Sequence, residues 1–503
     1  MATVREGAGM AMLLAALACG GSKATQPTNN PPVAVAKVTV TTPTASVVVR
    51  ALTPFAVVLE DANGGVLAGR AVTWQSSDTT VAMVDATGSV IALADGAASI
   101  SAASEGKSGS ADITVTRGTL PLRGLYVQFE RRGWPSGFYS GDVIRSFTDF
   151  DAVLGSTVAA EVAAQLDAIK ALGVNTVTFE LRATDATYDP SIEPYPMCNV
   201  SPPLGLQWPQ PDAAHLENLV AFFDLTQSKG VKILLRLVNT HFEDQYRTQS
   251  ATWLSAILNK VKSHAALELV LFEGDARHVD SNGDGTLDAC GTPAEPPLWL
   301  GPDAVPAKYV QWAIGHAMTL GIPARKLSAQ AVTGNWFIDN NGPSGSAATD
   351  SHLWHTVRVL KTVFDRLSIP DADRTYAISM YQATRCRFAS GLACTDATPP
   401  AWADQTLRRV WAEIGIRSRA RVIAVEMGVS EPLANGYGAE EALPSAVNLM
   451  RRHGVDGGSF WRWTHFTNDE EASVTAANAI KRRGAGYSYF PVKDSMVALY
   501  GAP

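Results

Sequence analysis

A repeated sequence pattern constrains the fold of this chain more than any other feature: an amphipathic helix, then a glycine, then a short apolar strand. A helical stripe of apolar residues that starts at Val158 ends at Gly173, and a second stripe ends at Gly230. The same pattern recurs at Gly321 and Gly454. Glycine is favoured just past a helix because it adopts the left-handed backbone conformation without a steric penalty. Helices and strands that alternate in this way predict repeated βα units and a parallel sheet.

Eight strands can be counted in the second part of the chain. They cover residues 122–129, 175–182, 231–238, 267–273, 326–332, 375–381, 421–427 and 457–463. Eight strands with intervening helices predict a TIM-type (β/α)8 barrel, an α/β fold that accounts for residues 118–503. In such barrels the active site lies at the C-terminal ends of the strands and on the loops that follow them.

The composition excludes several other classes of protein. Of 503 residues, 46% are hydrophobic and 18% are charged, which is typical of globular domains and not of disordered polyelectrolytes. The net charge of -7 offers no basic surface for nucleic acid. No apolar run reaches the length of about 18 residues that a transmembrane helix needs. The chain length allows two to four domains of about 150 residues each.

The first residues have the pattern of an export signal. Residues 10–18 form an apolar run that is too short to span a membrane. The run ends in Ala16-Leu17-Ala18-Cys19, which resembles a bacterial lipobox and implies that Cys19 becomes the lipidated first residue of the mature chain. We therefore expect a signal peptide over residues 1–19, a flexible tether over residues 20–34 and an exported lipoprotein of the bacterial cell envelope. A plain secretory signal is the alternative.

The remaining cysteines suit an exported protein. Four are left after Cys19, an even number for an oxidising compartment. Cys386 and Cys394 are eight residues apart and predict a local disulfide, which leaves Cys198 and Cys290 as the second candidate pair. No CxxC motif or Cys/His cluster indicates zinc.

Residues 35–117 follow a different pattern. Short runs alternate apolar and polar residues, as in Phe55, Val57 and Leu59, and turn signals separate the runs. This pattern predicts an antiparallel all-β sandwich. The segment with Trp74, the Ser76-Ser77-Asp78 turn and Gly88 resembles the bacterial Ig-like domain of group 2. The resemblance implies a spacer or adhesive module without catalytic residues, in which Trp74 belongs to the core.

Two glutamates stand at the C-terminal ends of predicted barrel strands. Glu273 ends the fourth strand, and Glu426 has the equivalent position on the seventh. Each continues an alternating series on its own strand; the two series are Leu269, Leu271, Glu273 and Val422, Ala424, Glu426. Alternate residues share one face of a strand, so we expect both carboxylates to point into the same barrel mouth. Glycosidic bond cleavage needs such a pair, one as the protonated acid and the other as the attacking anion.

This arrangement, together with Trp461 on the eighth strand, resembles the clan A glycoside hydrolases, and in particular the family-5-like cellulases and mannanases. In that clan the glutamate of strand four is the acid/base and the glutamate of strand seven is the nucleophile. The resemblance therefore implies that Glu273 is the acid/base and Glu426 the nucleophile, and that the anomeric configuration is retained.

One residue departs from the family pattern. Phe272 stands directly before Glu273, where the clan has an asparagine that binds the sugar 2-hydroxyl. Either another group holds that hydroxyl, or Glu273 is not the acid. Asp275 and Glu180 are the substitutes in the second case.

The same resemblance assigns substrate contacts to residues at or just beyond other strand ends. They are Arg182, Glu180, His241, Tyr381, Trp336, Trp461 and Trp463. The tryptophans offer aromatic faces on which sugar rings stack. Each assignment has a plainer alternative: a barrel-internal ion pair for Glu180 and Arg182, a loop position for His241, and core packing for at least one tryptophan.

A calcium-type loop follows the fourth strand. Residues 280–288 read DxNxDGxxD, and hard cations such as Ca²⁺ bind such arrays of oxygen ligands. The predicted ligands are Asp280, Asn282, Asp284, Thr286 and Asp288. Gly291 stands where an EF-hand has its bidentate glutamate, and a solvated acidic turn is the alternative. We expect the ion to stiffen the wall of the mouth, and we expect no organic cofactor.

These features predict a surface-anchored retaining glycoside hydrolase that cleaves a β-linked poly- or oligosaccharide. Its only link to the membrane would be the lipid anchor, and no nucleic-acid partner is expected. The alternative is a non-catalytic carbohydrate-binding or adhesive surface protein with a degenerate barrel, as Phe272 and the Ig-like module suggest. The two differ in one distance, because the carboxyl groups of a retaining enzyme lie about 5–5.5 Å apart.

Overall fold

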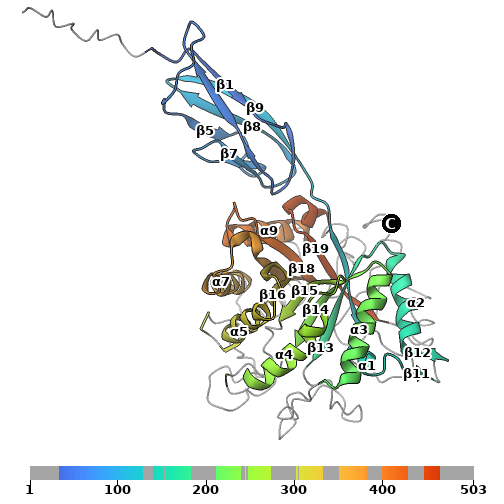
Figure 1. Ribbon diagram of the computed structural model, residues 1–503. Helices are drawn as coiled ribbons and strands as arrows, with labels where there is room; N and C mark the ends of the chain where they lie inside the picture. The colour runs from blue at the N-terminus through green and yellow to red at the C-terminus, as the bar shows by residue number, and fades with distance from the viewer. Residues whose placement is uncertain are drawn as a thin grey trace, which may run out of the picture.

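The computed structural model describes residues 33–128, 140–151, 155–182, 211–238, 244, 247–272, 302–303, 305–331, 351–381, 399–428 and 447–464. Two parts can be followed in Figure 1: an elongated β-domain and a barrel that is surrounded by helices. Residues 117–121 join the last strand of the β-domain to the first strand of the barrel.

The β-domain is a sandwich of short strands. They are β1 (Lys37–Thr41), β2 (Ser46–Val48), β3 (Leu52–Pro54), β4 (Ala56–Glu60), β5 (Thr73–Ser76), β6 (Ala82–Val84), β7 (Ser89–Ala92), β8 (Gly96–Ser104) and β9 (Lys107–Thr116). Strands β2-β9-β8-β5 form one sheet and β3-β7-β6 a second, while β1 pairs with β4. Every pair is antiparallel except β2 with β9. The predicted all-β sandwich is confirmed. Trp74, which was expected in the core, is partly buried and packs against the core of this domain.

The second part is a closed barrel of eight strands, each parallel to its neighbours. In barrel order they are β10 (Leu122–Gln128), β13 (Thr176–Arg182), β14 (Lys232–Val238), β15 (Leu267–Phe272), β16 (Leu327–Ala331), β17 (Thr375–Tyr381), β18 (Arg421–Gly428) and β19 (Gly457–Thr464). A two-stranded ribbon, β11 (Phe150–Asp151) with β12 (Ser156–Thr157), lies outside the barrel. The predicted (β/α)8 barrel is therefore confirmed.

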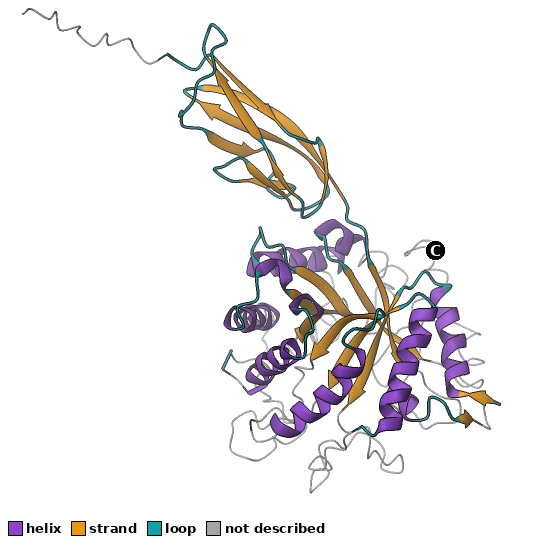
Figure 2. Cartoon of the chain, viewed as in Figure 1, coloured by secondary structure: helices purple, strands orange, loops and turns teal. Residues whose placement is uncertain are grey.

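Helices surround the barrel strands, as Figure 2 shows. They are α1 (Ser140–Arg145), α2 (Val158–Lys170), α3 (Ala213–Ser228), α4 (Arg247–Val261), α5 (Val305–Thr319), α7 (Ser351–Arg366) and α9 (Pro399–Ile414), with a further helical turn at residues 447–453. The apolar stripe of α2 is buried, and the glycines that follow the helices have positive φ, as at Gly173 (80°) and Gly454 (64°). The helix–glycine–strand pattern is thus confirmed as the repeating unit of the barrel.

Two apolar clusters hold the barrel together. The outer one joins alternate strand residues to the inward faces of the helices. The inner one fills the barrel and consists of strand residues alone, namely Leu122, Leu234, Leu269, Leu271, Ala377, Ile423 and Val425. Membership of the inner or outer cluster therefore shows which face of the barrel a strand residue occupies.

Two consecutive glycines let the last strand close the barrel. A Cβ at Gly457 would overlap the carbonyl oxygen of Leu122 on β10, and one at Gly458 would overlap that of Ala424 on β18. Any larger residue would push β19 away from both neighbours. The two glycines at the start of β19 are therefore a steric requirement of closure.

The β-domain rests on the N-terminal end of the barrel, opposite the end to which the strand arrowheads point (Figure 2). Arg50, between β2 and β3, donates through Nη2 to the carbonyl oxygens of Ile416 (2.7 Å) and Ser418 (3.0 Å). Its guanidinium lies 3.7 Å from the ring centroid of Trp411 on α9. Burial lowers the pKa of Arg50 to about 10, although Asp371 acts in the opposite direction.

Ion pairs extend this domain contact. Asp85 of the β-domain lies 3.1 Å from Nη1 of Arg417, which precedes β18. Asp95 lies 3.1 Å from Nε of Arg452, which precedes β19. Both arginines belong to the N-terminal end of the barrel, so the two domains meet through complementary charges at that end and leave the other end clear of the β-domain.

No helix among the described residues is long and apolar enough to cross a membrane.

Candidate active site

The backbone places several predicted site residues at one end of the barrel. Arg182 and Tyr381 are the last residues of β13 and β17. Glu426 lies in β18, and Trp461 and Trp463 lie in β19. Because all eight strands are parallel, these positions share the C-terminal end, which we call the mouth.

Other predicted residues lie outside the described part of the chain. They are Glu273, Asp275, His241, Trp336, the loop ligands Asp280, Asn282, Asp284, Thr286 and Asp288, and the cysteines Cys19, Cys198, Cys290, Cys386 and Cys394. Glu273 follows directly after Phe272, the last residue of β15. The calcium site, the disulfides, the lipid anchor and the acid/base therefore stay predictions.

The fourth barrel strand alternates as expected. Leu269 and Leu271 belong to the inner cluster, while Val270 and Phe272 belong to the outer one. Phe272 is fully buried there. The residue that replaces the family asparagine therefore packs toward the helices and does not line the mouth.

The seventh strand does not alternate as expected. Val422 and Ala424 belong to the outer cluster, and Ile423 and Val425 fill the barrel, so the predicted inward series was wrong. The register with β17 also changes along this strand: Ala424 pairs with Ile378, but Glu426 pairs with Ser379, which leaves Val425 as an extra residue. A β-bulge of this kind shifts all later positions by one.

The described part of the barrel interior holds one charged cluster near the mouth, formed by Tyr126 of β10, Glu180 of β13 and Arg236 of β14. The Tyr126 hydroxyl donates to Oε2 of Glu180. Nη1 of Arg236 lies 3.5 Å from the same oxygen. The exposed fractions of the three residues are 0%, 3% and 8%, so the cluster is almost closed to solvent.

These contacts bear on two interpretations of Glu180. The barrel-internal ion pair that was an alternative for this residue exists, and its described partner is Arg236. The roles of Glu180 as a substitute acid and as a substrate contact stay predictions.

Sequence reasoning missed Tyr126 and Arg236. Arg236 had a usable signal, because it interrupts the apolar run of β14, whose six residues from Ile233 to Val238 are all buried. An arginine inside such a run needs a buried partner. Tyr126 had no signal, because an aromatic residue is ordinary in a strand.

Several groups with shifted pKa values lie away from the mouth. Burial raises the pKa of Tyr376 to about 12, and this side chain belongs to the outer cluster. Burial also lowers the pKa of His215 on α3 and of His316 on α5. These shifts reflect packing of the helical layer and identify no acid or base at the strand ends.

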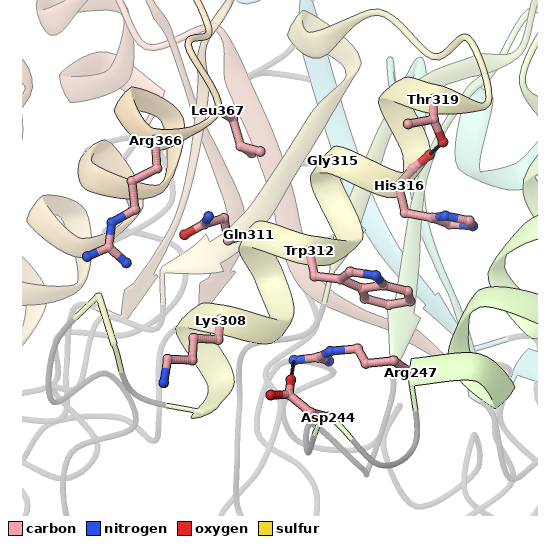
Figure 3. Close-up of a pocket in the computed structure, with 10 residues that line it drawn as sticks. All are labelled: Asp244, Arg247, Lys308, Gln311, Trp312, Gly315, His316, Thr319, Arg366 and Leu367. Atoms are coloured by element: carbon pink, nitrogen blue, oxygen red, sulfur yellow. Dashed lines mark hydrogen bonds and ion pairs between the residues drawn. The ribbon is translucent and has the colours of Figure 1, made fainter.

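A groove of about 810 Å³ lies on the outside of the helical layer (Figure 3). Its walls come from α5, the start of α4 and the end of α7. The Trp312 ring in this groove is stacked on His316, with centroids 5.4 Å apart, and Arg247 lies 5.0 Å from its centroid. Side chains of the same chain therefore already occupy the tryptophan surface, and the groove is separate from the mouth.

Metal-ligating side chains do not gather in the described residues, where no group of three or more His, Cys, Asp or Glu could hold an ion.

Several known solved structures are similar to this chain over part of its length. They include an endo-1,4-beta-D-mannanase from Thermotoga petrophila RKU-1 (13% identity, TM-score 0.36, covering 59% of this chain and 82% of that chain). A beta-mannanase from the blue mussel Mytilus edulis has 11% identity and a TM-score of 0.37, with 74% and 91% covered. An exo-beta-1,4-mannosidase from Opitutaceae bacterium strain TAV5 has 12% identity and a TM-score of 0.41, with 84% and 61% covered.

Sequence comparisons characterise the N-terminal part alone. No curated protein matches the chain. The family model of the bacterial Ig-like domain (group 2) matches residues 34–115, the segment that forms the β-sandwich, and the predicted resemblance of that segment is thereby confirmed.

Proposed function

We propose that this chain is a retaining glycoside hydrolase that cleaves a β-linked poly- or oligosaccharide at the bacterial cell envelope. The observation that carries the proposal is the closed parallel barrel, in which β15 ends at the mouth directly before Glu273 and β18 carries Glu426 close to its C-terminal end. Active sites of such barrels lie at this end.

The bulge in β18 supports the assignment of Glu426. Its register partner Ser379 comes two residues after Ala377, which belongs to the inner cluster. Residues paired in register between neighbouring strands share a face of the sheet. Glu426 therefore has an inward register position because of the bulge, not because of the alternation that the sequence suggested.

In the proposed reaction, the Glu426 carboxylate attacks the anomeric carbon while Glu273 protonates the departing glycosidic oxygen. The covalent glycosyl-enzyme then reacts with water, from which Glu273 takes a proton, and the configuration at the anomeric carbon is retained. Tyr381, Arg182 and His241 would orient the sugar and the carboxylates. Trp336, Trp461 and Trp463 would bind sugar rings by stacking.

The remaining assignments belong to the same proposal. Ca²⁺ held by Asp280, Asn282, Asp284, Thr286 and Asp288 would stiffen the loop after β15. Cys386–Cys394 and Cys198–Cys290 would be disulfides on loops at the mouth. Lipidated Cys19 and the tether would hold the chain at the membrane, with the β-domain between the tether and the barrel.

Replacement of Glu426 tests the proposal. We expect Glu426→Gln to lower kcat on a panel of soluble β-glucans and β-mannans by about a thousandfold or more, because the amide cannot attack. The wild-type product should form first as the β-anomer, which ¹H NMR of early product detects. Glu268→Gln, at the opposite end of β15, is the matched control and should keep its turnover. Undiminished turnover of Glu426→Gln would remove the proposed nucleophile.

A non-catalytic carbohydrate-binding protein remains the second candidate function, favoured by Phe272 in place of the family asparagine. It predicts binding of the same glycans, measured by calorimetry, with no release of reducing ends by the wild-type chain.

A further inference from the structure

We infer that the β-domain and the barrel form one rigid unit, in which the β-domain holds the mouth at a fixed distance from the point where the chain enters. The inference concerns the arrangement of the two domains and does not depend on the proposed activity. Relative motion is the ordinary expectation for two domains of one chain, so rigidity needs specific contacts. The described residues supply such contacts in the linker, at Arg50 and in two further loops of the β-domain.

The linker, which joins β9 to β10, is bonded to the barrel along its length. The Gly118 amide donates to a backbone carbonyl oxygen of the helical turn before β19, at 2.9 Å. Leu120 is 4% exposed and belongs to the outer apolar cluster of the barrel. The carbonyl oxygen of Pro121 accepts from Nδ2 of Asn175, at 2.9 Å. These contacts leave the linker without the freedom of a flexible coil.

Arg50 makes the central contact between the domains. Its side chain donates to two barrel carbonyls and lies over the Trp411 ring. Its backbone has a φ of 71°, a left-handed conformation that residues other than glycine seldom adopt and that persists where the surrounding structure imposes it. A Cβ at Gly454 would lie 2.3 Å from Cγ of Arg50, so a glycine at this position makes room for the arginine. The two domains are thus shaped to each other at this point.

Two other loops of the β-domain add contacts. In the β6–β7 turn, Asp85 lies 3.1 Å from Nη1 of Arg417, and Nη2 of the same arginine donates to the Ser89 carbonyl oxygen at 2.8 Å. In the β7–β8 loop, Asp95 lies 3.1 Å from Nε of Arg452. Partly exposed ion pairs are individually weak. Contacts from three separate loops nevertheless restrain rotation of the domains as well as their separation.

The chain enters the β-domain at the opposite end. The Val35 amide donates to Oε2 of Glu105, in the turn between β8 and β9, at 2.9 Å. From this turn β9 runs to Thr116, whose carbonyl oxygen accepts from the Val49 amide, next to Arg50. At about 3.3 Å per residue, β9 places the chain entry about 30 Å from the contact with the barrel. The mouth lies at the far end of the barrel from that contact (Figure 2).

The mouth and the chain entry therefore lie at opposite ends of one body. A β-domain that swung about its linker would let the mouth turn toward whatever holds the chain at its N-terminal segment. A fixed β-domain prevents this and keeps the mouth at the full length of the molecule from the chain entry. The β-domain is thus a rigid spacer and not a flexible arm.

Distances between spin labels in the full chain test this rigidity. Double electron–electron resonance is measured between labels at Lys107, at the far end of the β-domain, and at Lys260, near the end of α4. Both side chains are exposed. Labels on a ketone-bearing non-natural residue leave the native cysteines unchanged. A reference pair at Lys107 and Ala86 spans the β-domain alone. We expect the width of the interdomain distance distribution to stay within about twofold of the reference width, because both then report the motion of the labels.

A triple variant removes the side-chain contacts between the domains. It combines Arg50→Gly, which keeps the left-handed turn, with Asp85→Asn and Asp95→Asn. We expect it to widen the interdomain distribution about twofold or more relative to wild type, because rotation about the residues just before Gly118 is then no longer restrained.

Arg358→Met is the matched control. It removes an ion pair of 2.6 Å with Glu413 of α9, which lies inside the barrel domain, and should leave the interdomain width unchanged. The inference is overturned if the wild-type interdomain distribution has two peaks or is more than about twofold wider than the reference. It is also overturned if the triple variant, folded by circular dichroism, keeps the wild-type width, or if Arg358→Met widens the distribution as much.

The comparison of wild type with the reference pair decides the matter if the triple variant does not fold. None of these distances depends on turnover. A chain that cleaves no glycan but gives a narrow interdomain distribution would remove the proposed function and leave this inference standing.

Discussion

The barrel carries an arginine paired with carboxylates at each of its two ends, and the two pairs are built differently. At the mouth, Arg236 lies 3.5 Å from the carboxylate of Glu180, and both residues are buried. At the N-terminal end, Arg421 contacts two carboxylates at 2.8 Å each, Glu268 of β15 and Asp456 just before β19.

This difference in contact distance and in the number of acceptors indicates that the two ion pairs have different roles. Close contacts to two acceptors are what a stabilising cross-link between strands requires. The ion pair at the mouth is almost fully buried and therefore carries the larger desolvation cost. The ion pairs at the N-terminal end, where the β-domain also docks, therefore contribute to stability. The mouth keeps a buried charge that costs free energy, as expected at the end where the active sites of such barrels lie.

The largest expected loss of stability comes from the mouth. Arg236→Met should lower the free energy of unfolding by about 3–5 kcal/mol, because it removes a cation that pairs with the buried carboxylate of Glu180. Arg421→Met should cost about 2 kcal/mol, because Glu268 and Asp456 are partly exposed and water screens their charges. Urea unfolding followed by near-ultraviolet circular dichroism measures both. Equal losses for the two variants would show that the mouth and the N-terminal end do not differ in this way.

A smaller effect is expected where the β-domain docks on the N-terminal end. Arg50→Met should weaken the coupling of the two domains by about 1–2 kcal/mol, because it removes two hydrogen bonds to barrel carbonyls and the contact with the Trp411 ring. Scanning calorimetry should then resolve separate transitions for the β-domain and the barrel. Arg70→Met is the control, because Arg70 pairs with Glu105 inside the β-domain. A single unchanged transition in Arg50→Met would contradict the proposed coupling.

The smallest effect concerns pH and the outer helices near the N-terminal end. Burial lowers the pKa of His316, in the last turn of α5, where its Nε2 lies 2.8 Å from Oγ of Ser255. Below pH 6.5 the unfolded chain takes up a proton before the folded chain does, so this histidine contributes stability above that pH and loses it as the pH falls. His316→Gln should therefore make the decline in melting temperature between pH 7 and pH 5 less steep. The control His264→Gln should change this decline less than His316→Gln does. An unchanged slope would exclude His316 as a contributor.

Much of the fold could be predicted because its signals are local. The eight strands were expected within one or two residues of their observed bounds, since alternation within a strand and a glycine after a helix depend on neighbouring residues. The β-sandwich was predictable for the same reason. The strand ends then placed Glu426, Arg182 and Tyr381 at one mouth, because parallel strands share their C-terminal end.

Other features were decided only by the tertiary structure, because they depend on residues that are far apart in the chain. The bulge at Val425 appears only in the register of β18 against β17, and the inward position of Ile423 and Val425 appears only in the packed barrel. The pairing of Arg236 with Glu180 joins residues 56 apart, and the contact of Arg50 with Ile416 joins residues 366 apart. Local patterns specify how a segment folds, whereas register, charge pairing and domain docking are set by whichever distant surfaces the closed barrel brings together.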